Sequence, residues 1–346
     1  MRARWIDEWD GELRDGDRPR PEPGPGDVLV DVEACGVGMT VLNCIAGDLA
    51  RGPLEEGRVP GHELVGRIAA TGEGVDPARV GERVMAHFYL FCGACPRCLG
   101  GQEPLCEDLA GYLGVDRDGG YAELAAIPAR NAVAVPDGLG PVDATVVPDA
   151  VSTPVHVARR AAIAPGDRVA VVAAAGGVGI HMVQVARLHG AEVAGLEASD
   201  AKRRYLEEEL GVAAVDSGDF GAVRLPSAWH GRADVVVDLL GSEASLEWSL
   251  GALDRGGRLV VLTTFRDVCV SVSPRELVLG EGAVLGSRYA GRRELHLAAA
   301  LVASGRVRPV VGRRATVGDV DGLHRAIRDG ELIGRGALVW PEEAAA

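Results

Sequence analysis

The sequence predicts an α/β protein in which a mainly β half is followed by a parallel sheet covered by helices on both faces. Between about residues 28 and 135, short apolar stretches alternate with turn sequences such as GEG and DGG, a spacing typical of strands joined by turns. After residue 168, continuous apolar runs such as RVAVV and DVVVDLLG alternate with helical patterns, which favours a parallel sheet. The chain has 346 residues, 47% of them apolar, enough for about two domains with hydrophobic cores.

The β half begins with VLVDVEA at residues 28–34, where apolar and polar side chains alternate as in a half-buried strand. Further strands are predicted at LVGRIAA, RVMAHFYL and YAELAAI, and together they favour a barrel-like sheet. Near residue 143 the apolar residues change to helical spacing, and PGD at 165–167 is a turn signal. A domain boundary is expected there.

The second half contains apolar strands at 168–172, 234–241 and 257–264. A helix is predicted from Arg292 to about Gly305, because its apolar residues recur at helical spacing. The last apolar stretch, RGALVW, is predicted to be a strand that returns to the first domain.

Composition excludes several classes of function. With 36 Lys and Arg against 50 Asp and Glu, the formal charge is -14, which disfavours nucleic acid and anionic membrane surfaces as partners. The longest run without a charge-capable side chain, 169–180, contains three glycines and is shorter than the roughly 18 residues of a membrane helix. The charged start MRARWIDEWDGE lacks the apolar core of a secretion signal. We expect a cytoplasmic protein.

Four cysteines in CGACPRCLGGQEPLC form the strongest motif of the sequence. They are Cys92, Cys95, Cys98 and Cys106. Two CxxC steps and a fourth thiol can surround one tetrahedral ion. Disulfides and an iron-sulfur cluster are the alternatives, but a cytoplasmic setting disfavours the disulfides. The spacing predicts a structural zinc site in a lobe at residues 90–108, because four protein ligands leave no open position on the metal.

A glycine turn follows the strand RVAVV and opens a predicted helix, which is where a pyrophosphate binds free backbone N–H groups. The residues predicted to hold the cofactor in this turn are Ala174, Gly176, Gly177, Val178 and Gly179. Ala174 occupies the place of the first glycine of GxGxxG, and alanine is the smallest replacement for it. The alternative is a purely structural strand-to-helix turn.

Glu197 ends the next predicted strand, at the position where a carboxylate accepts hydrogen bonds from the adenosine ribose hydroxyls. Such a carboxylate repels a 2′-phosphate and favours NADH. Lys202, Arg203 and Arg204 follow closely and offer an alternative in which NADPH is bound. The cofactor is therefore predicted to be NAD(H) or NADP(H), with a preference for NAD(H).

The thiol-rich segment at 92–106, GHE at 61–63 and the dinucleotide-binding pattern from about residue 150 resemble the medium-chain alcohol dehydrogenase and reductase superfamily over nearly the whole chain. The resemblance implies a GroES-like catalytic domain formed by residues 1–148 and 290–346, a Rossmann domain at 149–289, and an active site in the cleft between them. It also implies a homodimer or homotetramer that acts on a small molecule.

In zinc alcohol dehydrogenases of this superfamily, the second Cys of CGVCxTD, the His of GHE and a later Cys or Asp hold the catalytic metal. This chain has CGVGMTV. Gly38 therefore stands at the first ligand position, and Val41 replaces the Asp that orients a basic residue on the pyrophosphate. His62 and Glu63 remain, and Asp149 falls where the third ligand belongs. The resemblance implies a degraded catalytic zinc site.

Other positions match the family's functional residues. Thr40 matches a hydroxyl that hydrogen-bonds the reacting oxygen, and Thr153 matches a threonine in contact with the nicotinamide, although both residue types also serve as ordinary capping or turn residues. Ser287 and Arg288 match the segment facing the nicotinamide carboxamide, and Arg335 matches a basic residue that reaches the pyrophosphate.

The turn AAAGGVG is similar to that of zinc-independent quinone and enoyl reductases, and the segment 279–311 resembles acryloyl-CoA reductase-like proteins. The sequence therefore favours a reductase of an activated C=C or C=N bond, in which Thr40 or His62 hydrogen-bonds the substrate and Asp149 orients the histidine. One alternative is a zinc alcohol dehydrogenase with an altered His, Glu and Asp site. Another is a dinucleotide-binding scaffold without activity.

Overall fold

The computed structural model describes residues 1–340, so residues 341–346 of the predicted segment 290–346 lie outside the described part. The chain forms two compact units. One comprises Met1–Ser152, Ala290–Gly305 and the segment from Pro309, and the other comprises Thr153–Tyr289 and Arg306–Arg308. Both α-helices and β-sheets are present, and the predicted α/β class is confirmed.

The first unit is built around a mainly antiparallel sheet. The strands of this sheet are β3 (Asp27–Val37), β4 (Glu63–Thr71), β5 (Arg83–Ala86), β6 (Leu124–Pro128), β7 (Ala132–Ala134), β14 (Val311–Ala315) and β15 (Arg335–Val339). A separate two-stranded sheet consists of β1 (Arg2–Trp5) and β2 (Arg14–Asp17). The helices of this unit are α1 (Met39–Ile45), α2 (Pro96–Leu99), α3 (Pro141–Ala144), α9 (Arg292–Ala303) and α10 (Val320–Arg328).

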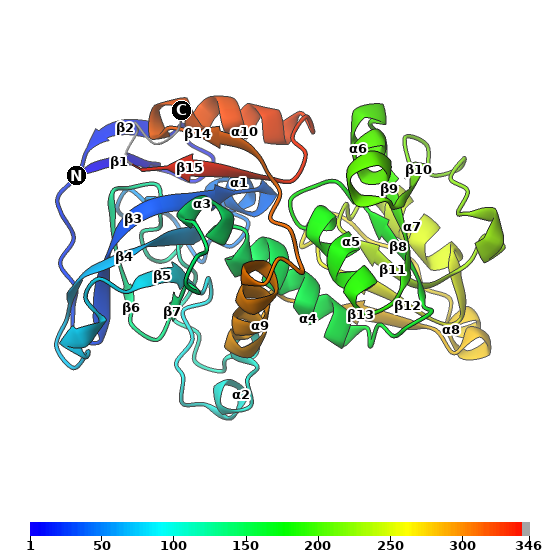
Figure 1. Cartoon of the computed structure of the whole chain (residues 1–346), viewed down its shortest axis with the longest axis horizontal. Coiled ribbons are helices and arrows are strands. Elements are labelled where there is room, and N and C mark those ends of the chain that lie inside the picture. The colour runs from blue at the N-terminus through cyan, green and yellow to red at the C-terminus, as the bar shows by residue number, and fades with distance from the viewer. Residues whose placement is uncertain (341–346) are drawn as a thin grey trace. The chain divides into compact units, whose positions relative to one another are not determined.

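The long strand β3 is the centre of this sheet. The strand order is β14-β15-β3-β4-β5-β7, and β6 pairs with β3 beside this path. Strand β15 pairs antiparallel with β3, as Figure 1 shows, so the predicted return of the C-terminal strand to the first domain is confirmed. Register places Gly336 opposite Val37 and Glu63 opposite Gly36. Side chains from three segments distant in sequence therefore meet at the C-terminal end of β3.

The second unit is a parallel sheet with helices. Its strands are β8 (Arg168–Val172), β9 (Glu192–Glu197), β10 (Ala213–Asp216), β11 (Ala233–Asp238), β12 (Leu253–Val261) and β13 (Ala283–Gly286). Its helices are α4 (Ser152–Arg160), α5 (Gly179–Leu188), α6 (Asp200–Leu210), α7 (Glu243–Gly251) and α8 (Pro274–Gly280).

Strand order in the second unit is β10-β9-β8-β11-β12-β13, and every neighbouring pair is parallel. The chain therefore starts at the central strand β8, builds one side of the sheet and then returns to build the other. Ligands of such sheets bind outside the carboxyl ends of the strands where the order reverses, which here is the end of β8 at Val172. Residues 169–172 are all buried, which explains their continuous apolar sequence.

The helical pattern near residue 143 is interrupted by one π-helical turn at Val147–Val151. The N–H of Val151 donates to the carbonyl of Val146, five residues earlier, at 2.9 Å. Pro148 lacks an N–H and cannot continue an ordinary helical ladder. This wider turn places Asp149 among buried side chains of the first unit.

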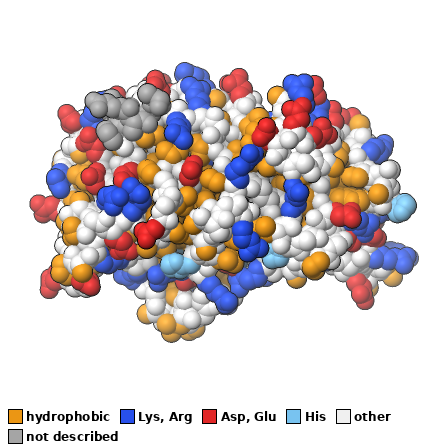
Figure 2. All heavy atoms as spheres, in the orientation of Figure 1, with side chains coloured by type: hydrophobic (Ala, Val, Ile, Leu, Met, Phe, Trp, Pro, Cys, Tyr) orange, Lys and Arg blue, Asp and Glu red, His pale blue; other side chains and the backbone are white. Residues whose placement is uncertain are grey.

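Helix length and the distribution of surface charge complete the description of the fold. Within residues 1–340, no helix is both long and apolar enough to cross a bilayer. On the face shown in Figure 2, acidic and basic side chains are interspersed instead of being separated into regions of one sign.

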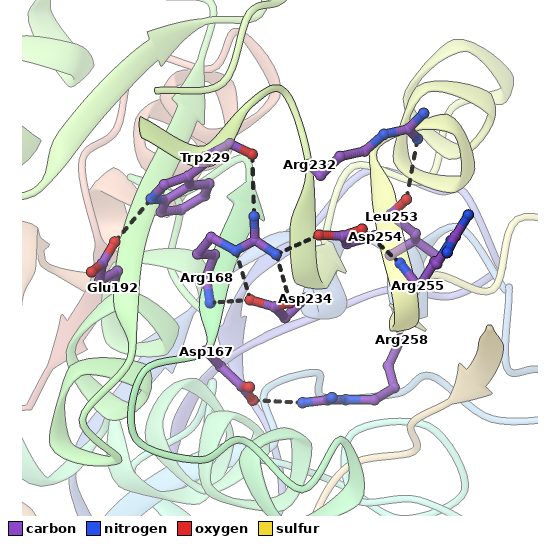
Figure 3. A network of polar contacts seen from close by, with 10 residues as sticks. All are labelled: Asp167, Arg168, Glu192, Trp229, Arg232, Asp234, Leu253, Asp254, Arg255 and Arg258. Atoms are coloured by element: carbon purple, nitrogen blue, oxygen red, sulfur yellow. Dashed lines mark hydrogen bonds and ion pairs between the residues drawn. The ribbon is translucent and has the colours of Figure 1, made fainter. Parts of the chain in front are cut away.

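Arg168 ties together three strands at the opposite end of the parallel sheet from the glycine turn (Figure 3). Its guanidinium donates to both carboxylate oxygens of Asp234 at 2.8 Å and to Asp254 Oδ2 at 2.7 Å, and its Nη1 donates to the carbonyl of Trp229 at 3.2 Å. The hydrogen bond from Arg168 lowers the pKa of Asp234, and also that of Asp254.

Replacing Arg168 with Met is expected to lower the free energy of unfolding by about 2 kcal/mol near pH 7, because hydrogen bonds to charged groups contribute roughly 1.5–3 kcal/mol. A carboxylate with a lowered pKa stabilises the fold above its unfolded pKa of about 3.9 and loses this contribution as the pH falls through the folded pKa. Urea unfolding at pH 7 and pH 3 should show the difference between the two proteins shrinking in acid. An equal difference at both values would contradict this role.

Candidate functional site

The four predicted cysteine ligands meet in one cluster. Their sulfur atoms lie within 4.8 Å of one another, with Cys92 Sγ 3.9 Å from Cys98 Sγ and Cys95 Sγ 4.0 Å from Cys106 Sγ. A disulfide needs about 2.05 Å, whereas thiolates about 2.3 Å from one tetrahedral zinc ion lie about 3.8 Å apart. The disulfide alternative is therefore wrong for these four free thiols, and the donor set fits zinc.

Local backbone turns prepare two of these thiols for metal binding. Cys92 Sγ accepts from the N–H groups of Ala94 and Cys95 at 3.4 and 3.3 Å, and Cys95 Sγ accepts from the N–H of Cys98 at the start of α2. The N–H of Ala94 lowers the pKa of Cys92, and that of Cys98 lowers the pKa of Cys95 to about 6. Thiolate is the form that binds a metal, so the fold favours the ligand form of both.

His62, Glu63 and Asp149 also come together, as the sequence predicts, with their ligand-type atoms within 4.8 Å of one another. All three are buried. His62 Nε2 lies 3.6 Å from Asp149 Oδ2 and has no hydrogen-bond partner within residues 1–340, while its ring packs on Phe88 with centroids 4.3 Å apart. This cluster can hold a cation or offer a polarised imidazole to a substrate.

Arg335 is the cation that contacts this cluster. Its Nε lies 2.8 Å from Glu63 Oε2, and its Nη2 lies 2.7 Å from the same oxygen and 2.9 Å from Asp149 Oδ2. The guanidinium is buried, with 2% of the residue exposed. Burial opposes its charge, but the two carboxylates raise the pKa of Arg335 above its ordinary value. The site therefore holds one permanent positive charge and two acids.

Gly36 in β3 and Gly38, which follows the strand and precedes α1, make room for this contact. Gly36 lies opposite Glu63, and a Cβ on Gly36 would come within 2.5 Å of Glu63 Oε2. A Cβ on Gly38 would come within 2.0 Å of Arg335 Nη1 and 2.3 Å of Arg335 Cζ. Gly38 keeps an extended backbone beyond the end of β3, and residues two apart in extended backbone point to the same side. The two glycines therefore leave space on one side, where the acid and the guanidinium meet.

Residue 38 gives this cluster no metal ligand, because it is a glycine. Zinc sites of this kind use three protein ligands and favour a thiolate or imidazole among them, but residue 38 has no side chain and the guanidinium occupies the space beside it. The remaining donors, His62, Glu63 and Asp149, include two acids that already hold Arg335. A divalent ion at this place would compete with Arg335 for Glu63 and Asp149.

The glycine turn lies between β8 and α5, as predicted. A Cβ on Gly179 would come within 2.2 Å of the Ala173 carbonyl oxygen and 2.9 Å of Ala174 Cα, so this position requires glycine for the close approach of helix and strand. Ala174 is fully buried against β9, where a Cβ on Gly195 would come within 2.8 Å of its methyl. The turn leaves backbone N–H groups at the start of α5 for a pyrophosphate.

Glu197 lies at the end of β9 next to this turn. Its Oε1 accepts from the N–H of Ala175 at 2.7 Å, and burial raises its pKa. Arg203 is held by the carbonyls of Glu197 and Ala198, each at 2.8 Å, and forms ion pairs with Asp200 and Asp216. Arg203 is therefore already engaged at the end of the strand, while Lys202 is partly exposed nearby on α6.

The remaining predicted residues belong to different elements. Thr40 is a half-buried residue of α1, and Thr153 is a buried residue in the first turn of α4. Ser287 follows β13, its N–H donates to the Val261 carbonyl at 3.0 Å, and its hydroxyl has no partner within the described residues. Arg288 is exposed. Thr40 lies in the first unit, whereas Thr153, Ser287 and Arg288 lie in the second unit.

The contact that sequence reasoning missed is that of Arg335 with Glu63 and Asp149. The signal was present in two replacements, Gly38 at a ligand position and Val41 in place of the orienting Asp. The first change leaves space at residue 38, and the second removes the Asp that orients this arginine in the family that the sequence resembles. Which way the guanidinium then turns depends on the register of β15 against β3.

Comparisons with known proteins identify the family of this chain. Residues 24–137 match the alcohol dehydrogenase GroES-like domain, and residues 177–304 match the zinc-binding dehydrogenase family. An alcohol dehydrogenase of Geobacillus stearothermophilus is 31% identical over 99% of this chain and 100% of its own. An acryloyl-coenzyme A reductase of Metallosphaera sedula is 32% identical over 80% of this chain and 82% of its own. The structure of a thermostable alcohol dehydrogenase from Pyrobaculum aerophilum, 32% identical, covers 98% of this chain and 99% of its own with a TM-score of 0.87.

Similarity over the full length of such relatives, together with the dinucleotide turn on a parallel sheet, defines the chain as an NAD(P)-dependent oxidoreductase. The predicted cofactors, a nicotinamide dinucleotide and a structural zinc ion, agree with this class. The chain belongs to the medium-chain dehydrogenase/reductase superfamily, among its members that are similar to zinc-type alcohol dehydrogenases. The predicted resemblance is therefore confirmed.

Proposed function

We propose that this protein reduces an activated C=C or C=N bond, or a carbonyl, with NAD(P)H and without a tightly bound catalytic zinc ion. The observation that carries the proposal is the guanidinium of Arg335 on Glu63 and Asp149, beside a glycine at residue 38. The acryloyl-coenzyme A reductase relative supports this substrate class, since its name describes reduction of a C=C bond conjugated to a thioester.

Such bonds are suitable for reduction without a Lewis acid. The bound cofactor supplies a hydride. A conjugated C=C bond spreads the incoming negative charge onto a carbonyl oxygen, and an iminium bond already carries a positive charge. Hydrogen bonds and positioning then supply the remaining barrier reduction. We assign the dinucleotide to the turn at 174–179 together with Glu197, Lys202, Thr153, Ser287 and Arg288. Arg335, which the sequence places on the pyrophosphate, is instead buried on Glu63 and Asp149.

His62 and Thr40 are the proposed groups for the substrate oxygen. The buried Nε2 of His62 has no hydrogen-bond partner within residues 1–340, and an unsatisfied buried polar atom is costly unless a ligand pairs with it. Asp149 Oδ2 lies 3.6 Å from this nitrogen, so the acid acts on the ring through its charge, while Arg335 holds the acid in place. In this arrangement His62 or Thr40 donates a hydrogen bond, or a proton, to the substrate.

The alternative function is an alcohol dehydrogenase in which His62, Glu63 and Asp149 bind a second metal. The clustering of these three residues and the alcohol dehydrogenase relatives favour it. The two functions differ in metal content, since the alternative requires about two zinc ions per chain and the reductase about one.

Zinc per chain, measured by elemental analysis during a chelator titration, tests the proposal together with a substrate screen. We expect about one zinc ion per chain, which the chelator removes only as the four-cysteine lobe unfolds. We also expect NAD(P)H oxidation with enones, enoyl thioesters or iminium compounds. A second zinc ion that is removed without unfolding, combined with turnover of alcohols, would establish the alternative instead.

Thr40→Val is expected to lower kcat about tenfold while leaving NADH binding nearly intact, because one neutral hydrogen bond contributes roughly 0.5–1.5 kcal/mol. Thr40→Ser, which keeps the hydroxyl, is the matched control and should retain most of the activity. Steady-state kinetics on the substrate found in the screen measure both. Equal turnover of the valine variant and the wild type would remove Thr40 from the mechanism.

We further propose a cytoplasmic location, a small-molecule substrate and a homodimer or homotetramer, all supported by the family. The same family organisation supports residues 1–148 and 290–346 as the catalytic domain and 149–289 as the dinucleotide-binding domain. Size-exclusion chromatography with light scattering tests the oligomeric state.

A further inference from the structure

We infer that the imidazole of His181 is a positioning group for the dinucleotide, because it holds the carbonyl of Gly177 in the glycine turn. His181 lies in the first turn of α5 and is fully buried. Its Nδ1 lies 2.8 Å from the Gly177 carbonyl oxygen. The inference rests on the proposed assignment of the dinucleotide to this turn, and it is independent of the reaction that the protein catalyses.

The partner atom determines which ring nitrogen of His181 carries a proton. A carbonyl oxygen only accepts hydrogen bonds, so a hydrogen bond at this place requires a proton on Nδ1. Without that proton, two lone pairs would face each other at 2.8 Å inside the protein, and a buried polar group is costly unless it is paired. The Nδ1–H group of His181 therefore donates to the Gly177 carbonyl.

This side chain takes the place of a backbone donor. In a regular α-helix the N–H of His181 would donate to the carbonyl of Gly177, four residues earlier. Here this N–H donates to the Val178 carbonyl at 3.2 Å, and the N–H of Met182 donates to the same oxygen at 2.9 Å. The first turn of α5 is therefore tighter than an α-helical turn. The imidazole holds the carbonyl that the backbone N–H of the same residue does not.

The hydrogen bond also sets the direction of the next N–H group. A trans peptide is planar, so the N–H of Val178 points away from the carbonyl of Gly177. With that carbonyl held toward α5, the N–H points out of the start of the helix, where a pyrophosphate binds. Within residues 1–340, no backbone carbonyl accepts from the N–H of Gly177 or Val178, and Val178 provides no side-chain cap. His181 thus directs a donor that the dinucleotide can use.

Dissociation constants for NADH and ADP-ribose, measured on the full chain by fluorescence and by competition, test this role without any substrate. His181→Leu removes the donor and should weaken NADH binding about tenfold. ADP-ribose contains the pyrophosphate but lacks the nicotinamide, so it should lose affinity by the same factor. A loss for NADH alone would place the effect at the nicotinamide and would overturn the inference.

Two further variants separate positioning from packing, with urea unfolding as the check on stability. His181→Asn carries an amide N–H at the position of Nδ1 and should bind NADH within about threefold of the wild type. His189→Leu makes the leucine substitution at the exposed C-terminal end of α5 and should bind as the wild type does. A folded His181→Leu with wild-type affinity, or a folded His181→Asn as weak as the leucine variant, would overturn the inference.

The wild-type protein provides the test if the variants at residue 181 do not fold. Nuclear magnetic resonance of protein with isotope-labelled histidines identifies which ring nitrogen is protonated. We expect a proton on Nδ1 of His181 with and without NADH. A ring protonated on Nε2 alone would overturn the inference. Failure of the proposed function is a separate outcome, because it would appear in the metal content and in the substrate screen, with these binding constants unchanged.

Discussion

Chelation of zinc from the four-cysteine lobe is expected to unfold residues 90–108. The lobe has little structure of its own, since its regular elements are only the short helix α2 and one 3-10 turn at Glu103–Leu105. Several of its side chains are exposed, Leu99 at 77% and Leu105 at 49%, so burial of apolar surface contributes little here. Zinc binding to small cysteine sites contributes on the order of 10 kcal/mol of folding free energy, and the lobe depends on that contribution.

Loss of the lobe should extend to helix α9. Glu103 is buried, and its Oε2 accepts from the N–H of Arg292 at 3.3 Å at the start of that helix. Arg130 also donates to the Cys92 carbonyl at 2.5 Å. Hydrogen exchange should therefore show lost protection in the lobe and in the first turn of α9 on chelation, with residues 168–197 unaffected.

A thiol outside the cluster provides the control for this prediction. Cys98→Ser removes one ligand and should abolish zinc binding and lobe protection. Cys269→Ser removes an exposed thiol that lies outside both clusters of metal-type ligands in the described chain, and it should leave the zinc content unchanged. A Cys98→Ser protein that keeps its zinc ion and its protection would show that the lobe folds without this site.

Local patterns predicted the elements that depend on neighbouring residues. The apolar run at 168–172 predicted β8, and the glycine turn after it predicted the start of α5. Strand, turn and helix follow one another directly in the sequence, so the pattern is visible in one short segment. The clustering of the four cysteines was predicted for the same reason, since CxxC spacing brings two sulfur atoms close together. The short hairpin of β1 and β2 was not predicted, because its residues RARW and RDGD lack a clear strand pattern.

The contact of Arg335 with Glu63 could not be predicted in the same way. The two residues are 272 positions apart in the chain and meet only because β15 and β4 both pair with β3. The sequence showed that Gly38 removes a metal ligand, but not that this glycine makes room for a guanidinium. Gly38 therefore has two effects: it removes a metal ligand, and it leaves space for the guanidinium. The second effect becomes visible only in the register of β15 against β3.

Glu197→Gln is expected to reduce the preference for NADH over NADPH by about ten- to a hundredfold. Glu197 is buried, with 7% of the residue exposed. Because little solvent screens its negative charge, the carboxylate should repel a 2′-phosphate strongly. Replacing a charge-assisted hydrogen bond to the ribose with a neutral one costs about 1–2 kcal/mol. NADH should bind more weakly, while NADPH loses a repulsive partner and binds at least as well as before.

The glutamine variant separates the charge of Glu197 from its structural role. Glutamine keeps a side-chain oxygen that accepts from the N–H of Ala175, which the carboxylate accepts at 2.7 Å in the structure. Glu197→Ala loses this acceptor as well and should also lower the free energy of unfolding, because a buried N–H is left unpaired at a cost of about 1–3 kcal/mol. Dissociation constants from NAD(P)H fluorescence, with urea unfolding of both variants, measure the two effects.

If Glu197→Gln binds both dinucleotides as the wild type does, the carboxylate serves the turn and not the ribose. Cofactor choice would then depend on Lys202, since Arg203 is already held by the Glu197 and Ala198 carbonyls.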